Sequence, residues 1–392
     1  MKLPLLSLCL LVSFAAQSQL SSVARVDTGI INGAAYRIDL PPNWGQPGAP
    51  RRLLMYAHGY QTKGSPTGLN TAQEVAYFQD AFVKAGYALA RSAYRQQGWA
   101  LTEGVEDTEA LRKYFVQKYG QPDSTFITGH SMGGMITVAT IEKYPQYYQA
   151  GMPMCPNTGR VYELMKTRVF DLLVTFDALF PNTLPPLSEL ALGNANSLAQ
   201  VFSQKNGQIE PSAAYINKLK ADSAKARQFA ERYDIKPADL AWVIPFYAVI
   251  LADISQKAGG NPFDNTNTVY GGFGDNVAVN AKAVRLTETP GARRYLEKDG
   301  AFTGQLSKPL LVLHTTYDQL IPSNYATGYE DLARQAGKEQ LFVVKYTNSQ
   351  GHCVFTPQET ANAFNQLRRW AKTGTKPVAG ELKPANGLVS GK

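Results

Sequence analysis

Long hydrophobic runs are scarce in this 392-residue chain, and so are clusters of basic residues. Beyond an apolar run at residues 3–14, we find no stretch that indicates a membrane-spanning helix of about 20 residues. The net charge is +8, but lysines and arginines are scattered, with only short pairs such as Arg51-Arg52. No basic stripe interleaved with aromatic residues stands out. We therefore expect no nucleic-acid partner and no stable membrane insertion.

The first 18 residues have the features of a signal peptide. Lys2 supplies a positive start, residues 3–14 form a short apolar core, and small residues follow as far as Ser18. The apolar core is too short to span a bilayer, so we expect cleavage after about Ser18. The mature protein is then secreted or periplasmic.

Cysteine is also scarce: the chain has three, of which Cys9 lies inside the expected leader. In an oxidising compartment the other two, Cys155 and Cys353, commonly pair. Cys155 follows an apolar segment that predicts a strand, and Cys353 lies in a loop expected at the same sheet edge. Either a disulfide joins them or they remain two buried thiols. Neither cysteine stands at a metal-ligand spacing, and we expect no metal and no other cofactor.

A Gly-x-Ser-x-Gly pattern at residues 129–133 is the most informative motif. The preceding residues 124–128 are rich in β-branched and aromatic types and predict a buried strand. Residues 135–144 predict a helix that ends before Pro145. A strand, a tight glycine-flanked turn and a helix together form the setting of a nucleophilic serine, here Ser131. The alternative is a glycine-rich turn with an ordinary exposed serine.

Four histidines limit the choice of a base for Ser131. His130 adjoins the serine, so its side chain should diverge from it. His314 lies within an apolar run that predicts a strand, where a buried core histidine is expected. His352 instead lies in the loop after a predicted strand at residues 341–346. We expect His352 to take the serine proton.

Asp318 is the candidate for the carboxylate that orients His352. It lies in the loop after the predicted strand around His314 and precedes His352 in the chain, the order that a Ser-Asp-His hydrolase requires. The alternative for both residues is a local turn hydrogen bond.

The tetrahedral intermediate of such a reaction needs two N–H donors. We expect one from the amide of Met132, directly after the nucleophile. A predicted strand at residues 52–57 leads into His58-Gly59-Tyr60, and the second donor is expected from the amide of Tyr60. His58 then shapes this loop and is not a second base.

Together, the His58-Gly59-Tyr60 loop, the turn at Ser131 and the Asp318/His352 pair resemble the α/β-hydrolase superfamily, in particular secreted esterases and lipases and prolyl-oligopeptidase-like enzymes. The likeness spans residues 27–155 and 306–372. The first two motifs also resemble those of cutinase-like polyester hydrolases. His352-Cys353 is similar to tannase and fungal feruloyl-esterase relatives, in which cysteines beside the serine and the histidine are bonded together. Here His130, not cysteine, precedes the serine. The resemblance implies a mostly parallel sheet flanked by helices.

The 150 residues from 156 to 305 are too many for a normal connection between sheet elements. We expect them to form a mainly helical cap, inserted before the acid-bearing strand, with helices near 160–180, 188–205, 211–233 and 237–258. The hydrolase core then comprises residues 19–155 and 306–372. Residues 373–392, rich in glycine, proline and lysine, are expected to form a flexible tail.

Two aromatic groups have open roles. Loop 94–100, which holds Trp99, either lines the substrate site or packs on the domain. The cap aromatics either wall an acyl pocket or form the cap's own core: Phe170, Phe176, Phe180, Phe202, Tyr215, Trp242, Phe246 and Tyr247.

These observations predict a serine hydrolase that cleaves small-molecule or polymeric carboxylic esters through an acyl-enzyme. One alternative is a serine peptidase of prolyl-oligopeptidase type, although Ser131 lies too early in the chain to follow a propeller domain. Another is a non-catalytic binding protein on the same fold. The oligomeric state is left open.

Overall fold

A nine-stranded sheet forms the centre of the protein, in a computed structural model that describes residues 23–65, 69, 77, 79–205 and 208–383. The strand order is β1-β2-β4-β3-β5-β6-β9-β10-β11. The pairs β1–β2 and β2–β4 are antiparallel, and all other neighbours are parallel. The strands are β1 (Arg25–Ile31), β2 (Ala34–Leu40), β3 (Arg52–Ala57), β4 (Tyr87–Ser92), β5 (Ser124–His130), β6 (Ala150–Met154), β9 (Leu310–Tyr317), β10 (Phe342–Gln350) and β11 (Gly380–Glu381).

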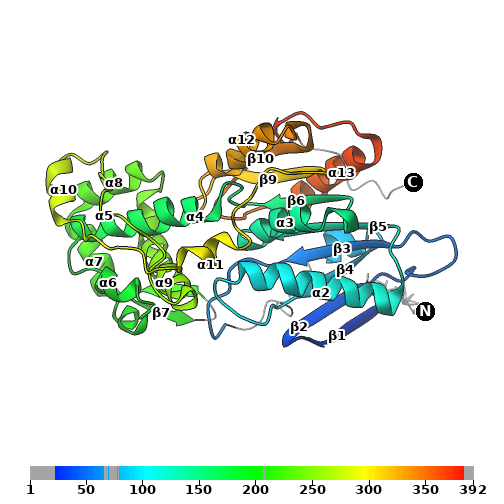
Figure 1. The fold of residues 1–392 in the computed structure, drawn as a ribbon, viewed down its shortest axis with the longest axis horizontal. Helices are drawn as coiled ribbons and strands as arrows, with labels where there is room; N and C mark the ends of the chain where they lie inside the picture. The colour runs from blue at the N-terminus through cyan, green and yellow to red at the C-terminus, as the bar shows by residue number, and fades with distance from the viewer. Residues whose placement is uncertain (1–22, 66–68, 70–76, 78, 206–207, 384–392) are drawn as a thin grey trace, which may run out of the picture.

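Helices cover both faces of this sheet (Figure 1). One face carries α2 (Leu101–Tyr119), α3 (Met132–Lys143) and α12 (Gly328–Gln335), and the other carries η1 (Gln79–Val83) and α13 (Pro357–Thr373). Adjacent strand residues therefore alternate between two cores: Leu53 packs on the first face and Leu54 on the second, both fully buried. Burial on both faces explains why these strands read as continuous apolar runs.

The chain after α13 differs from the expected flexible tail, which is wrong for residues 380–382. β11 pairs in parallel with β10, Leu382 is buried, and Lys345 Nζ donates to the Glu381 carbonyl at 2.6 Å. The free edge of β10 offers unpaired backbone groups that a short strand satisfies. The end of the expected tail, residues 384–392, and the expected leader, residues 1–18, lie outside the described residues.

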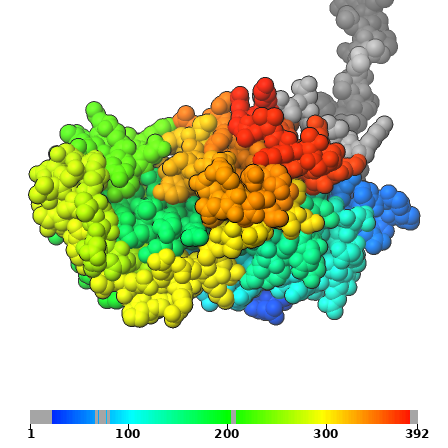
Figure 2. Space-filling view, turned by 45° about the horizontal axis from the view of Figure 1, so that its top comes forward, coloured from blue at the N-terminus to red at the C-terminus, as the bar shows by residue number. Residues whose placement is uncertain are grey.

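In the chain the cap is inserted between β6 and β9, and in space it forms the end of the molecule away from β1 and β2 (Figure 1). Figure 2 shows its green-to-yellow surface in continuous contact with the core. It is mainly helical, but a β7–β8 hairpin stands where the sequence predicted the end of one helix and the start of another. Its elements are α4 (Val161–Leu164), η3 (Met165–Phe170), α5 (Asp171–Leu179), α6 (Leu187–Leu190), η4 (Asn196–Gln200), β7 (Phe202–Lys205), β8 (Gln208–Pro211), α7 (Ala213–Ala221), α8 (Ser223–Arg232), η5 (Pro237–Asp239), α9 (Leu240–Ala258), α10 (Asn276–Lys282) and α11 (Arg293–Glu297).

Most of the cap aromatics form the cap's own core. Phe176 packs at 5.0 Å between ring centroids on Phe180 and at 5.4 Å on Phe229. Two neighbours on α9, Phe246 and Tyr247, instead face the serine-bearing edge of the sheet.

The segment Pro237–Ala258, which contains α9, is long and apolar enough to cross a membrane, contrary to the sequence expectation. It is the one such helix among the described residues. Of its apolar window, 67% is buried inside the protein, as in the central helix of a packed cap. Its apolar character is thus explained by burial in the cap.

Candidate active site

Ser131 occupies the sharp turn between β5 and α3, with φ 56° and ψ −119°. This backbone conformation is costly for a residue with a side chain and persists only where the surroundings impose it. A Cβ on Gly129 or Gly133 would overlap the carbonyl oxygen of Ala57 in β3. Glycine is therefore needed on both sides of the serine, because the turn packs directly against the neighbouring strand.

His352 and Asp318 meet at the same sheet edge, with His352 Nδ1 2.7 Å from Asp318 Oδ2. Asp318 is 1% exposed, and its Oδ1 accepts the amides of Leu320 and Ile321 at 2.9 Å each. An ionised carboxylate only accepts hydrogen bonds, so the His352 proton lies on Nδ1 and Nε2 keeps its lone pair.

The charge of Asp318 follows from these contacts. Burial by itself would raise the pKa of Asp318, but the His352 imidazole and the Ile321 amide outweigh burial and hold that pKa below its usual range. Asp318 is accordingly a carboxylate at neutral pH.

Ser131 and His352 line one cavity of about 630 Å³, which we call the open cleft. No hydrogen bond joins Ser131 to His352 within the described part of the chain; His352 Nε2 lies 3.5 Å from Cys353 Sγ. Such contacts are often long before substrate binds. The cleft wall is rich in aromatic rings: Tyr56, Tyr60, Tyr77, His130, Phe246 and Phe355.

The loop His58-Gly59-Tyr60 lies against the serine turn. A Cβ on Gly59 would stand 3.1 Å from the His130 carbonyl oxygen and 3.3 Å from Ser131 Cβ. Met132 is the first residue of α3, so its amide has no partner within the helix. Among the described residues, neither this amide nor that of Tyr60 finds an acceptor. Two N–H donors are thus left beside Ser131.

The other three histidines have neutral rings, buried at His58 and His314 and partly buried at His130. His58 stacks on Tyr94 at 3.9 Å, and burial lowers the pKa of His58 to about 4. The His130 ring turns to the Tyr56 hydroxyl, 3.1 Å away, and burial lowers the pKa of His130 to about 3. His314 is fully buried within β9, where burial lowers its pKa. None of the three approaches Asp318 as His352 does.

A disulfide joins Cys155 to Cys353, with Cα atoms 5.3 Å apart. It connects the residue after β6, where the chain leaves for the cap, to the residue after His352. Both sulfur atoms and a His352 nitrogen lie within 4.8 Å of one another. Because the sulfurs are bonded to each other, they are not thiolate ligands for a metal.

Asp253, on the cap helix α9, reaches the loop that holds Tyr60, a contact that the sequence analysis missed. Its carboxylate accepts the Tyr60 hydroxyl and the Trp99 amide and lies 2.6 Å from Lys63 Nζ. Burial and this carboxylate raise the pKa of Tyr60 well above its usual value. The available signal was that Asp253 is the one charged residue in the apolar stretch 240–255.

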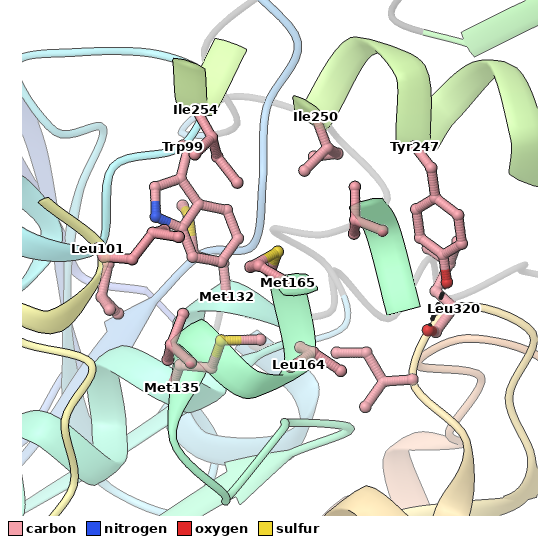
Figure 3. Packing of buried hydrophobic residues seen from close by; sticks show 14 of the residues in the cluster. Trp99, Leu101, Met132, Met135, Leu164, Met165, Tyr247, Ile250, Ile254 and Leu320 are labelled. Atoms are coloured by element: carbon pink, nitrogen blue, oxygen red, sulfur yellow. Dashed lines mark hydrogen bonds between the residues drawn. The ribbon is translucent and has the colours of Figure 1, made fainter. Parts of the chain in front are cut away.

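Arg168, on the cap segment η3, makes a similar contact with the loop after Asp318. Its guanidinium donates to the carbonyl of Gln319 at 2.9 Å and to that of Leu320 at 3.3 Å. Tyr247 of α9 donates to the same Leu320 carbonyl at 2.6 Å (Figure 3). In this loop the backbone N–H groups therefore donate to Asp318, while the backbone carbonyls accept from cap side chains. No local pattern around Arg168 indicated this role.

A second cavity, of about 40 Å³, also touches Ser131, and we call it the closed slot. Trp99 lies in its wall and is 3% exposed, so loop 94–100 packs on the domain and also borders this cavity. Side chains from the core, from the cap and from the loop after Asp318 surround this slot (Figure 3). Its other apolar lining residues are Met132, Met135, Leu164, Met165, Val169, Phe246, Ile250, Leu320 and Ile321.

An α/β-hydrolase is defined by the mostly parallel sheet, the glycine-flanked serine turn at its carboxyl edge and the Asp318–His352 pair. Comparison with known families agrees. The chain belongs to the tannase-like family of unknown function (DUF6351), whose model matches residues 12–222. The protein is therefore a hydrolase of the α/β-hydrolase type.

Individual relatives are distant. Over 74 residues the chain is 32% identical to an o-phthalyl amidase from Xanthobacter agilis, a match that covers 19% of this chain and 16% of the amidase. Among solved structures, Est1E from Butyrivibrio proteoclasticus is 12% identical with a TM-score of 0.43, covering 88% of this chain and 98% of Est1E. A putative dipeptidyl aminopeptidase IV from Bacteroides ovatus is also 12% identical, with a TM-score of 0.47, covering 90% of this chain but 36% of the peptidase.

Proposed function

We propose that this protein is a serine hydrolase that cleaves carboxylic esters through an acyl-enzyme on Ser131. The observation that carries the proposal is the convergence at one sheet edge of a strained serine, a histidine hydrogen-bonded to a buried carboxylate, and two unpaired amides. A binding protein would need none of these features together, and the strain at Ser131 has a cost that catalysis explains.

The reaction follows from the placement of these groups. His352 Nε2 takes the Ser131 hydroxyl proton as Oγ bonds to the acyl carbon, and the amides of Tyr60 and Met132 stabilise the resulting oxyanion. His352 then gives that proton to the leaving oxygen as its bond to carbon breaks. Water repeats the sequence with the same base and releases the acid, while Asp318 holds the imidazole in the required tautomer.

Covalent labelling tests this proposal. A fluorophosphonate probe should label Ser131 in the folded protein, and peptide mass spectrometry should locate the adduct. The Ser131→Ala variant should lose both the label and ester hydrolysis. Labelling that persists in this variant would place the nucleophile elsewhere.

An amide substrate is the second candidate, and the likeness to o-phthalyl amidase favours it. The same groups cleave an amide if His352 protonates the leaving nitrogen before the bond to carbon breaks. Matched ester and anilide substrates with one acyl group decide between the two. A kcat/KM for the anilide equal to or above that for the ester would favour an amidase or peptidase.

We also propose that the protein is exported after cleavage near Ser18. The disulfide supports this, because such bonds persist in oxidising compartments. Intact mass of the protein purified from its native source tests the proposal, since a mature form that begins close to Gln19 is expected. Recovery of the uncleaved chain in a reducing compartment would contradict it.

A further inference from the structure

The two cavities that meet at Ser131 differ in size, chemistry and access to the base. The open cleft holds about 630 Å³ and includes His352 in its wall. The closed slot holds about 40 Å³, has an almost wholly apolar wall and does not include His352. Both include Tyr60, Ser131, Phe246 and Leu320, so the serine stands at their junction.

The need to protonate the leaving oxygen indicates which cavity takes the alcohol part of an ester and which takes the acyl part. His352 must reach the leaving oxygen to protonate it, so the alcohol part lies on the side of His352, in the open cleft. The acyl chain extends from the same carbon in a different direction. The closed slot borders Ser131 and the donor residues Tyr60 and Met132, and it is the apolar space left for that chain.

The volume of the slot limits the length of the acyl chain. A water-sized group needs about 10–15 Å³ measured in this way, so about 40 Å³ accommodates roughly three non-hydrogen atoms. Three of the lining side chains, Met135, Leu164 and Ile250, are at most 4% exposed. A longer chain would have to displace residues that are already packed from both the core and the cap (Figure 3).

We infer that the enzyme is selective for esters of short aliphatic acids, of about two to four carbons, joined to bulky and preferably aromatic alcohols. This inference rests on the proposed function and adds its substrate class. Leu164 and Ile250, from two cap segments that face Met135 of the core, set the acyl length, while the aromatic wall of the open cleft accepts the alcohol.

p-Nitrophenyl esters of two, four, eight and twelve carbons test the acyl side, because the leaving group stays constant. We expect kcat/KM for the four-carbon ester to exceed that for the eight-carbon ester by at least about 10-fold, given the 10–200-fold effect of one methylene in an apolar pocket. At constant acetate, naphthyl and phenyl esters should be cleaved with similar efficiency. A preference for eight or twelve carbons would overturn the inference.

Leu164→Ala should enlarge the slot and lower the four-to-eight-carbon ratio by about 10-fold. Leu173→Ala is the matched control, because Leu173 of the nearby cap helix α5 is also buried but does not line the slot. Equal changes in both variants would show that general loosening of the cap, and not the slot, sets the preference. Ile250→Ala provides a second opening of the slot if Leu164→Ala does not fold.

Fluorophosphonates with ethyl and dodecyl chains separate this inference from the proposed function. Faster labelling of Ser131 by the ethyl probe in the wild type is the expected result. Labelling at equal rates would leave the nucleophile in place and overturn the short-acyl inference. No labelling by either probe would overturn the proposed function itself.

Discussion

The core and the cap contribute to one site by different physical means. In the core, backbone geometry places the groups: Ser131 has a positive φ, and Gly129 and Gly133 allow β3 to approach. In the cap, charged side chains position the groups, since Arg168 and Asp253 contact core loops. The serine turn thus depends on a short local sequence, whereas the placement of the loops around it depends on contacts between segments far apart in the chain.

The largest loss of activity is expected from the core nucleophile. Ser131→Ala should lower kcat by a factor on the order of 10⁶, because the members of such a set act as a unit. Ester hydrolysis under saturating substrate measures it, with circular dichroism as the control for folding. A loss below about 10-fold would show that the core edge does not hold the chemistry.

Asp318→Asn should follow with a loss of about 10⁴ in kcat, because an amide that donates to His352 leaves the ring in the wrong tautomer. The protein should still fold, since the asparagine oxygen can accept the amides of Leu320 and Ile321. His314→Gln is the control, because His314 also lies close to Asp318 but is not a base here. An equal loss of activity in a folded His314→Gln variant would contradict the assignment of His352.

Loss of the Cys155–Cys353 disulfide should lower the stability of the protein more than it lowers kcat. Cys353→Ser should lower the free energy of unfolding by about 2–5 kcal/mol. Urea denaturation of the wild type with and without reductant gives the same comparison without a mutation. The double variant Cys155→Ser/Cys353→Ser separates loss of the bond from the effect of a lone thiol; unchanged stability in all three cases would refute a structural role.

The cap contact at Asp253 should have a smaller effect on turnover. Asp253→Ala should lower kcat by about 10-fold to 100-fold, less than the 10²–10³ that removal of an oxyanion donor costs, because the Tyr60 amide is displaced but not deleted. Asp253→Asn should restore much of the loss, since it still accepts from Tyr60 and Trp99. Lys63→Met is the control that keeps those bonds. A change in KM alone would argue against a role in positioning Tyr60.

Acid should destabilise the core specifically, because all four histidines lie there and none lies at residues 156–305. The pKa values of His58, His130 and His314 are lowered by burial, so below pH of about 6.5 the unfolded chain binds protons that the folded chain does not. Stability is therefore full above that pH and is lost as the pH falls towards 4, by about 1.4 kcal/mol per pH unit for each histidine.

Urea unfolding between pH 7 and pH 4.5 measures this slope. His130→Gln should reduce the slope of unfolding free energy against pH by the contribution of one proton, about 1.4 kcal/mol per pH unit, even if the variant is less stable at pH 7. The same slope in the variant and the wild type would show that His130 does not contribute.

The same contrast explains how far the sequence could predict the structure. The order of Ser131, Asp318 and His352, each after an apolar run, indicated the parallel sheet and the residues brought to its edge. The contact of Arg168 was not predictable, because it depends on where the cap folds back. For Asp253 the sequence offered a lone charge in an apolar stretch but did not indicate its partners, which lie in a distant loop. The β7–β8 hairpin and β11 were missed for a related reason: short strands form where a partner edge is available.

The disulfide also changes what a cut in the chain would do. The bond spans 198 residues and closes a ring that begins at the end of β6, contains the whole cap and Asp318, and finishes one residue past His352. Cleavage of the cap by a protease would open this ring without releasing a fragment, because both new pieces stay tied at the sheet edge. A hydrolase built in this way would keep Ser131 on the same molecule as Asp318 and His352 after a cut in the cap, and the two pieces would separate on a gel only after reduction.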